Sequence, residues 1–181
     1  MFPECADLLK WELRDVQNAD VLNVGSNTWS HYHDEQPWIW KAVLNPLLER
    51  GCWIVNMDTK EELVAMPSHR LKHVVSDATA AKIYGPKFDM ALCTSMLEHV
   101  ESPRRVLDVC HDSLKIGGIL WLELPSVYPI HHDPIDNGLR ITTREQADEL
   151  LGPHWGERYY WHFDAAAPFE GKGVLIKAVA K

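Results

Sequence analysis

The 181 residues suffice for one domain, and 46% of them are hydrophobic, which excludes an intrinsically disordered chain. The 26 acidic and 18 basic side chains give a formal net charge of −8, which argues against a surface that binds nucleic acid. No apolar run reaches the ~20 residues of a membrane-spanning helix. The first residues show neither the basic nor the apolar region of a signal peptide, so we expect a cytoplasmic protein.

Residues 1–19 are predicted to cover the domain that residues 20–181 form, because Leu9, Leu13 and Val16 recur at helical spacing. From residue 20 onward, short apolar runs alternate with amphipathic stretches, a pattern typical of a parallel α/β sheet. Five of these runs are mostly apolar, as expected of strands that are covered on both faces: residues 21–25, 53–57, 73–76, 88–93 and 119–124.

A helix is predicted over residues 37–50, with a break at Pro46, which removes a backbone donor, and an end at Gly51. The clearest helix starts with Ser102 as N-cap and Pro103 at the first helical position. We expect it to carry Lys115 in its last turn.

That helix is predicted to end near residues 117–118, which are both glycine. A further helix begins at Thr143, where Gln146 stands at the spacing of a capping box, and ends at residues 152–153.

The C-terminal part contains two predicted strands, residues 157–163 and 173–180, joined by a connection too short for a crossover helix. Because parallel neighbours need a dozen or more connecting residues, these two strands are expected to pair antiparallel. The predicted fold is α/β: a three-layer Rossmann-like domain whose seven-stranded, mostly parallel sheet has an antiparallel last strand.

The four cysteines are expected to be reduced, because none belongs to a C-x-x-C pair. Cys52 and Cys93 lie in apolar runs, where a thiol behaves as a small hydrophobic side chain. We therefore predict neither a disulfide nor a cysteine-based metal site from Cys5, Cys52, Cys93 and Cys110.

Two residues follow the first two strands at positions suited to a ligand. Gly25 lets the backbone approach a ligand at the carboxyl end of the first strand, or it only satisfies a turn. Asp58, after the second strand, is placed either to hold the hydroxyls of a ribose or to cap the turn that follows it. No G-x-G-x-x-G motif is present, which disfavours a nicotinamide cofactor.

The middle of the chain resembles a class I S-adenosylmethionine-dependent methyltransferase of the large type 11 group. The resemblance lies in Phe-Asp-Met-Ala-Leu-Cys at 88–93, Met-Leu-Glu-His-Val at 96–100, Ser-Pro at 102–103 and Lys-Ile-Gly-Gly at 115–118. The match extends from about residue 20 to residue 152. It implies a seven-stranded sheet with an antiparallel last strand, which agrees with the strand count above.

The resemblance also implies S-adenosylmethionine as cofactor and a set of contacts to it. In such a fold Gly25 lies under the methionine part, Asp58 holds the ribose, and Asp77 with Ala78 faces the adenine. The segment after the fourth strand lines the cleft near the sulfonium. The implied cofactor-binding residues are Gly25, Ser26, Asn27, Asp58, Asp77, Ala78, Thr94, Ser95 and Met96.

The first motif departs from the family pattern, which is an acidic residue followed by G-x-G-x-G. Asn23 replaces the acidic residue, Asn27 the second glycine and Trp29 the third. Asparagine tolerates a positive φ, so Asn27 can preserve the turn, whereas Trp29 crowds or covers the pocket.

Histidines and carboxylates follow the fourth and fifth strands, where such a fold places its chemistry. Methyl transfer requires a general base only when the acceptor loses a proton, and His99 and His131 suit that role near neutral pH. His132, Asp136 and Arg140 are predicted to bind the substrate; alternatively, Arg140 forms an ion pair with Asp136. The other interpretations of this region are a solvated loop and, less favoured, a metal site.

The sequence therefore predicts a methyltransferase that acts on a small-molecule or saccharide-like acceptor, with no nucleic-acid or membrane partner. Two alternatives stay open: a catalytically impaired binding or assembly module with the same fold, and a His/Asp metal-dependent hydrolase. Among the eight tryptophans, Trp40, Trp53 and Trp121 are predicted to be core residues, and Trp29 stands where the family has glycine.

Overall fold

The computed structural model describes residues 3–25, 39–61, 68–82, 87–127, 136–165 and 171–181. Within these ranges, no helix is both long and apolar enough to cross a membrane. All four cysteines are described, and each is a buried free thiol.

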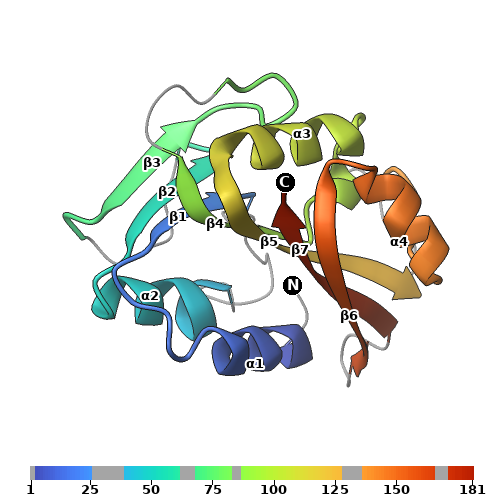
Figure 1. Ribbon diagram of the computed structural model, residues 1–181, viewed down its shortest axis with the longest axis horizontal. Helices are drawn as coiled ribbons and strands as arrows, with labels where there is room; N and C mark the ends of the chain where they lie inside the picture. The colour runs from blue at the N-terminus through green and yellow to red at the C-terminus, as the bar shows by residue number, and fades with distance from the viewer. Residues whose placement is uncertain (1–2, 26–38, 62–67, 83–86, 128–135, 166–170) are drawn as a thin grey trace.

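The strands form one sheet in the order β3-β2-β1-β4-β5-β7-β6 (Figure 1). Strands β3, β2, β1, β4 and β5 pair parallel, whereas β7 runs antiparallel to both of its neighbours. This arrangement confirms the predicted seven-stranded Rossmann-like fold. The strands are β1 (Asp20–Val24), β2 (Trp53–Asp58), β3 (Leu71–Val75), β4 (Phe88–Thr94), β5 (Leu114–Val127), β6 (Trp155–Ala165) and β7 (Gly171–Ala180).

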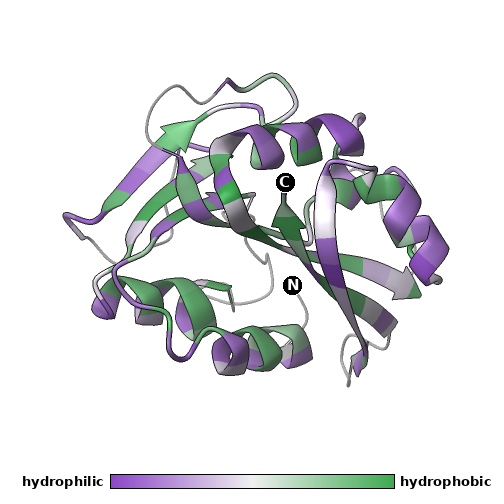
Figure 2. Ribbon diagram, in the orientation of Figure 1, coloured by the Kyte–Doolittle hydropathy of each residue, from purple (hydrophilic) through white to green (hydrophobic). Residues whose placement is uncertain are grey.

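Helices cover both faces of the sheet, and a separate apolar cluster fills the space on each side (Figure 1). On one face lie α1 (Pro3–Glu12), the π-helical turn η1 (Trp40–Leu44) and α2 (Asn45–Glu49). On the other lie α3 (Pro103–Ser113) and α4 (Arg144–Leu151). Figure 2 shows polar and apolar residues alternating along α3, as expected of a helix that buries one side only.

The predicted break at Pro46 coincides with a change of helix type. The turn before it is a π-helix, in which the amide of Asn45 donates to the carbonyl of Trp40, and Pro46 then lies in the first turn of α2. Because proline lacks an N–H, the regular ladder is interrupted here, and a wide π turn is one way to accommodate the interruption.

The predicted end of the helix after Pro103 was wrong, because α3 stops at Ser113. Leu114 is already extended, with φ −83° and ψ 150°, and pairs with Phe88 in the sheet. Lys115, expected in the last helical turn, places its Nζ 2.7 Å from Asp89 Oδ1. Pairing with β4 and this ion pair override the helical continuation that the local sequence favours.

The tryptophans divide differently from the prediction. Trp40 and Trp121 are core residues as expected, at 0% and 2% exposure. Trp53 is not a core residue, since 51% of it is exposed. It is the first residue of β2, and its ring contacts Arg70 and His69 instead of the core.

The helix predicted to begin at Thr143 is α4. The Thr143 hydroxyl accepts from the amide of Gln146, whose side chain in turn accepts from the amide of Thr143. The helix ends at Gly152, whose φ is +74°. The capping box is thereby confirmed, and it positions the segment that precedes α4 at the carboxyl edge of the sheet.

Candidate functional site at the carboxyl edge of the sheet

A row of three polar side chains, two buried and one half-buried, crosses three strands on the face covered by α1 and α2. Asn23 of β1 donates from Nδ2 to Asn56 Oδ1 on β2 at 2.6 Å. Asn56 Nδ2 lies 3.1 Å from His73 Nδ1 on β3. His73 Nε2 in turn lies 2.8 Å from the carbonyl of Lys60. Parallel register brings the three residues level, because Asn23 pairs with Asn56 and Asn56 with His73.

The row also defines the hydrogen-bonding roles of the imidazole. Since Asn56 Nδ2 is a donor, His73 Nδ1 accepts from it, and Nε2–H donates to the Lys60 carbonyl. Asn23, which replaces the acidic residue of the family pattern, is completely buried and bonded within this row. The amide therefore satisfies a neighbouring amide, a role that a carboxylate cannot take without reorienting the row.

The carboxyl ends of β1 and β4 meet at the point where strand order reverses, which is where ligands bind in open α/β sheets. Gly25 follows β1 with φ +68°, and its amide donates to the Met57 carbonyl at 2.9 Å. A Cβ at this glycine would lie 2.4 Å from Met96 Cγ, on the segment that follows β4. Only glycine fits at this position. We call the close packing of Gly25 against Met96 at the carboxyl edge of the sheet the cradle.

Two predicted cofactor-binding carboxylates lie at the end of β2 and just after β3. Asp58 is 7% exposed, and its Oδ1 accepts from the amide of Lys60 at 3.0 Å. Asp77 Oδ1 accepts from both the amide and the hydroxyl of Thr79, each at 2.8 Å. Ala78, beside it, is buried. Each carboxylate thus orders its own turn, which is the capping role considered above for Asp58, and both turns lie at the carboxyl edge.

The segment after β4 holds a hydroxyl against a buried carboxylate. Ser95, at φ +45°, donates from Oγ to Glu123 Oε2 of β5 at 2.6 Å. Thr94, just before it, is buried and pairs with Glu123 in the sheet. Glu123 is completely buried, and its Oε1 has no hydrogen-bond partner among the described residues.

A second buried carboxyl lies beside the first. Glu98 belongs to the short 3₁₀-helix η2 (Leu97–His99), is 5% exposed, and its Oε2 has no hydrogen-bond partner in the described part of the chain. Burial, followed by the proximity of Glu123, raises the pKa of Glu98 from 4.5 to about 8. Glu98 is therefore mainly protonated at neutral pH.

Two of the predicted catalytic and substrate-binding residues, His99 and Arg140, lie close to Glu98. His99 Nε2 is 3.7 Å from Glu98 Oε1. Arg140 NH2 is 2.6 Å from Asp136 Oδ2, so the alternative of an ion pair between them is the arrangement observed. Asn137 next to Asp136 donates from Nδ2 to the carbonyls of Leu97 and Val100, which ties this segment to η2.

Four predicted site residues lie outside the described residues: Ser26, Asn27, His131 and His132. Trp29 also lies outside them. Among the described residues, no group of three or more histidine, cysteine, aspartate or glutamate side chains is arranged to hold a metal ion.

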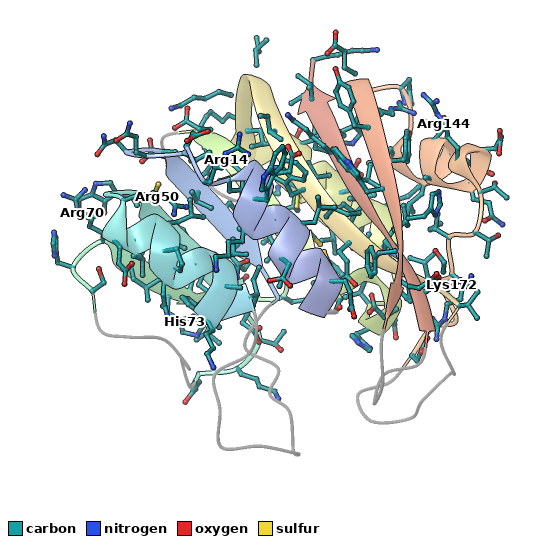
Figure 3. The ribbon with its side chains drawn as sticks, turned by 90° about the horizontal axis from the view of Figure 1, so that it is seen from below. Arg14, Arg50, Arg70, His73, Arg144 and Lys172 are labelled. Atoms are coloured by element: carbon teal, nitrogen blue, oxygen red, sulfur yellow. The ribbon has the colours of Figure 1, made fainter. Side chains whose placement is uncertain are left out.

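A cavity of about 400 Å³ opens at the β6–β7 side of the same edge. The end of β5, the end of β6 and the start of β7 line it, and its ionisable side chains are His162, Asp164 and Lys172. Lys172 Nζ and Asp164 Oδ1 lie 3.1 Å apart. Figure 3 shows Lys172 and His73 on opposite sides of the molecule, so the cavity and the polar row flank the β1–β4 cradle.

Sequence reasoning did not single out Glu123, Asn56 or His73. For Glu123 a signal existed, because a glutamate within the apolar stretch Trp-Leu-Glu-Leu at 121–124 is expected to be buried, and buried carboxyls are uncommon. No comparable signal marks Asn56 and His73, since only strand register brings them together.

The chain is similar to known methyltransferases in part of its sequence and in its fold. The model of the methyltransferase domain family matches residues 41–122. The fold is also that of an S-adenosylmethionine-dependent methyltransferase from Mesorhizobium loti, with TM-score 0.68, 16% identity and 96% of each chain covered. This is a class I methyltransferase fold.

Two further methyltransferases share the fold. N-methyltransferase NodS from Bradyrhizobium japonicum, solved with S-adenosyl-L-homocysteine, aligns with TM-score 0.65 and 12% identity over 98% of this chain and 86% of its own. The 1,6-didemethyltoxoflavin-N1-methyltransferase from Burkholderia thailandensis aligns with TM-score 0.66 and 18% identity over 98% and 77%. A search of curated proteins found no match.

The residues matched by the family model cover only part of the candidate site. The family match ends at Leu122, so it covers β2, β3, β4 and most of β5 and stops one residue before Glu123. Gly25 and the polar residue Asn23 precede the matched part. The matched part therefore contains Asn56, His73 and Glu98, whereas Asn23, Gly25 and Glu123 lie outside it.

Proposed function

We propose that this protein is an S-adenosylmethionine-dependent methyltransferase that acts on a small-molecule or saccharide-like acceptor. The observation that carries the proposal is the cradle at the β1–β4 switch point, where no residue larger than glycine fits at position 25 against Met96. The NodS and didemethyltoxoflavin N1-methyltransferase structures, both with S-adenosylhomocysteine, have the same fold and support the choice of cofactor.

The residues of the site fit such a cofactor. Gly25 and Met96, which pack closely at the ends of β1 and β4, are assigned to the methionine part, and Asp58, the buried carboxylate at the end of β2, is assigned to the ribose. Asp77 and Ala78 are assigned to the adenine, and Thr94, Ser95 and Met96 to the wall beside the methyl group. Ser26 and Asn27 are assigned to the same cofactor on the family pattern alone.

The cofactor, when bound, supplies an activated methyl group, so the protein contributes alignment and proton transfer. His99 and His131 are the proposed bases, and His99 lies 3.7 Å from the carboxyl of Glu98. Arg140, held by Asp136, forms a fixed cationic group beside η2 that suits an anionic part of the substrate. His132 is assigned to the same role, and the cavity beside β6 and β7 is the proposed acceptor pocket.

The first test is ligand binding. We expect S-adenosylmethionine and S-adenosylhomocysteine to raise the melting temperature of the purified protein, because a ligand that binds only the folded state stabilises it. Isothermal titration calorimetry then gives the affinity. Absence of heat and of any shift with both ligands refutes the proposal.

The second candidate function is a methyltransferase-fold binding or assembly module without catalysis. The burial of Asn23 and its bond to Asn56 favour it, because the acidic side chain that helps order the cofactor in the family is missing. The two functions differ in turnover. Transfer of a labelled methyl group to any acceptor excludes the module, whereas cofactor binding without transfer to a broad panel of acceptors supports it.

A further inference from the structure

The contact between Ser95 and Glu123 joins a surface segment to the interior. Ser95 is half-buried on the segment directly after β4, between two residues of the proposed cofactor wall. Its hydroxyl donates to Glu123 Oε2 at 2.6 Å, a short distance typical of a hydroxyl bonded to a carboxylate. The left-handed backbone at Ser95, with φ +45°, is rare for a residue other than glycine, so the fold maintains this orientation at some cost.

The interior end of this contact has unused acceptor capacity. Glu123 is 0% exposed, and Oε1 has no hydrogen-bond partner among the residues that the structure describes. A buried carboxyl with one orphaned oxygen is costly, and stability alone does not explain its presence in the middle of a strand. The adjacent Leu122 and Leu124 are completely buried.

We propose that Ser95 and Glu123 form a proton relay for the methyl acceptor: Ser95 Oγ takes the proton of an acceptor hydroxyl or amine and passes its own proton to Glu123. This inference rests on the proposed methyltransferase function and names the class of acceptor. An acceptor that loses a proton from an O–H or N–H group can pass it to this relay instead of to His99 or His131, whereas tertiary amines and thioethers lose no proton.

The relay balances in protons and electrons. The acceptor X–H bond breaks and a new Ser95 Oγ–H bond forms, while the original Ser95 Oγ–H bond breaks and a Glu123 Oε2–H bond forms. With a sulfonium donor, the electron pair that the acceptor retains would form the new bond to the methyl carbon, while the sulfur–methyl bond would break and its electron pair would stay on sulfur as a neutral thioether. Ser95 is the catalytic residue in this scheme, and Glu123, acting through it, is the positioning residue and final proton acceptor.

The surroundings of the two carboxyls suit this division. Among the described residues, Glu98 of η2, Cys5 of α1 and Cys93 of β4 interact electrostatically with Glu123, and the Cys93 thiol itself lies against Cys110. Glu98 is itself faced by His99 and Arg140. Of the two carboxyls, Glu123 is the one to which the Ser95 hydroxyl donates, whereas burial keeps Glu98 mainly protonated near neutral pH.

The experiment compares Ser95→Gly and Glu123→Gln with the wild-type protein. Glycine is comfortable at φ +45°, so Ser95→Gly removes the hydroxyl without adding backbone strain. Ser113→Ala is the matched control, because Ser113 Oγ also makes a 2.6 Å bond, to the Val109 carbonyl, in α3 away from the site. Melting temperatures verify that each variant folds.

Three readouts are taken. Calorimetry gives the affinity for S-adenosylmethionine. Single-turnover transfer of a labelled methyl group to an aliphatic amine, a phenol and a monosaccharide gives the rate as a function of pH. Titration of ¹³C-labelled glutamate by NMR follows Glu123, whose signal is assigned by its loss in Glu123→Gln.

With S-adenosylmethionine at a concentration that saturates each variant by calorimetry, we expect Ser95→Gly and Glu123→Gln to slow transfer by at least ~100-fold and to lose the acidic limb of the pH–rate profile. Ser113→Ala keeps the wild-type rate. The titration midpoint of Glu123 rises in Ser95→Gly, because its ionised form loses a donor.

Transfer by Ser95→Gly within about threefold of wild type overturns the relay while leaving the methyltransferase proposal intact. Lack of cofactor binding by the wild-type protein overturns the methyltransferase proposal, and the relay with it. If the cofactor binds and no acceptor of the panel is methylated, the NMR titration decides: an unchanged Glu123 midpoint overturns the relay, and a raised midpoint supports it.

Discussion

At the scale of single residues, Gly25 is subject to two separate constraints. Its φ of +68° lies in the left-handed region, and a Cβ would lie 2.4 Å from Met96 Cγ. The first constraint is intrinsic to the backbone, and the second arises only because β1 and β4 end side by side. Sequence analysis could propose the turn but not the contact with Met96.

We predict that Gly25→Ala lowers the free energy of unfolding by roughly 2–4 kcal/mol, since strain and overpacking add. It also weakens binding of S-adenosylmethionine. Urea unfolding and calorimetry measure the two effects. Gly138→Ala is the matched control, because Gly138 has φ +80° and no atom within 4 Å of its Cβ position, so that variant reports strain alone. Equal losses in the two variants would contradict the packing argument.

At the scale of elements, the position of η2 depends on one side chain from a distant segment. Asn137 Nδ2 donates to the carbonyls of Leu97 and Val100, at 2.8 and 2.7 Å, and thereby fixes both ends of the short helix that carries Glu98 and His99. A helix of three residues has too few bonds of its own to hold this position.

We predict that Asn137→Asp, which keeps the shape but removes both donors, lowers the free energy of unfolding by roughly 2–3 kcal/mol. It also lowers the hydrogen-exchange protection of the His99 amide, which donates to the Met96 carbonyl. Urea unfolding and exchange measured by NMR test this. Glu101→Gln, an exposed change two residues after η2, is the control and should alter neither the free energy of unfolding nor the protection of the His99 amide. Unchanged protection in Asn137→Asp would show that η2 is held by other contacts.

The elements also show where local sequence is a sufficient guide. The capping box of α4 and the break at Pro46 were predictable, because each depends on residues within one turn. The end of α3 was not, because Leu114 and Lys115 are fixed by Phe88 and Asp89 on β4. The glycines at 117–118 predict a later end, but contacts between residues distant in sequence end α3 at Ser113.

At the scale of the whole molecule, the buried carboxyl of Glu98 in η2 makes stability depend on pH. The pKa of Glu98 is about 8 in the folded protein and 4.5 ordinarily, so the folded state retains a proton that the unfolded state releases. The contribution of Glu98 to the free energy of unfolding is full below about pH 4.5 and is lost as the pH rises through about 8. As an upper bound, the loss is of the order of 5 kcal/mol.

We predict that Glu98→Gln, which resembles the protonated carboxyl, removes most of this decline and makes the protein more stable than wild type above the pKa of about 8. Urea unfolding at acidic and at mildly alkaline pH measures the difference. Glu101→Gln serves again as the exposed control and should keep the wild-type slope. A Glu98→Gln protein with the same slope as wild type would assign the pH dependence to other groups.

The sequence alone determined the layers of this protein, because alternating apolar runs and capped amphipathic helices are local patterns whose physical cause lies within a few residues. It also marked the edge of the sheet at which Gly25, Asp58 and Ser95 lie, since parallel strands end together.

Only the tertiary structure decided which side chains meet there. Strand register aligned Asn23 with Asn56 and His73, and Glu123 with the segment that carries Ser95. Trp53 became a surface residue because it opens its strand and contacts Arg70, although its neighbours in the sequence are apolar. Burial raises the pKa of Glu98, so this carboxyl keeps its proton near neutral pH. Desolvation depends on all the residues packed around a side chain, and the local sequence does not specify them.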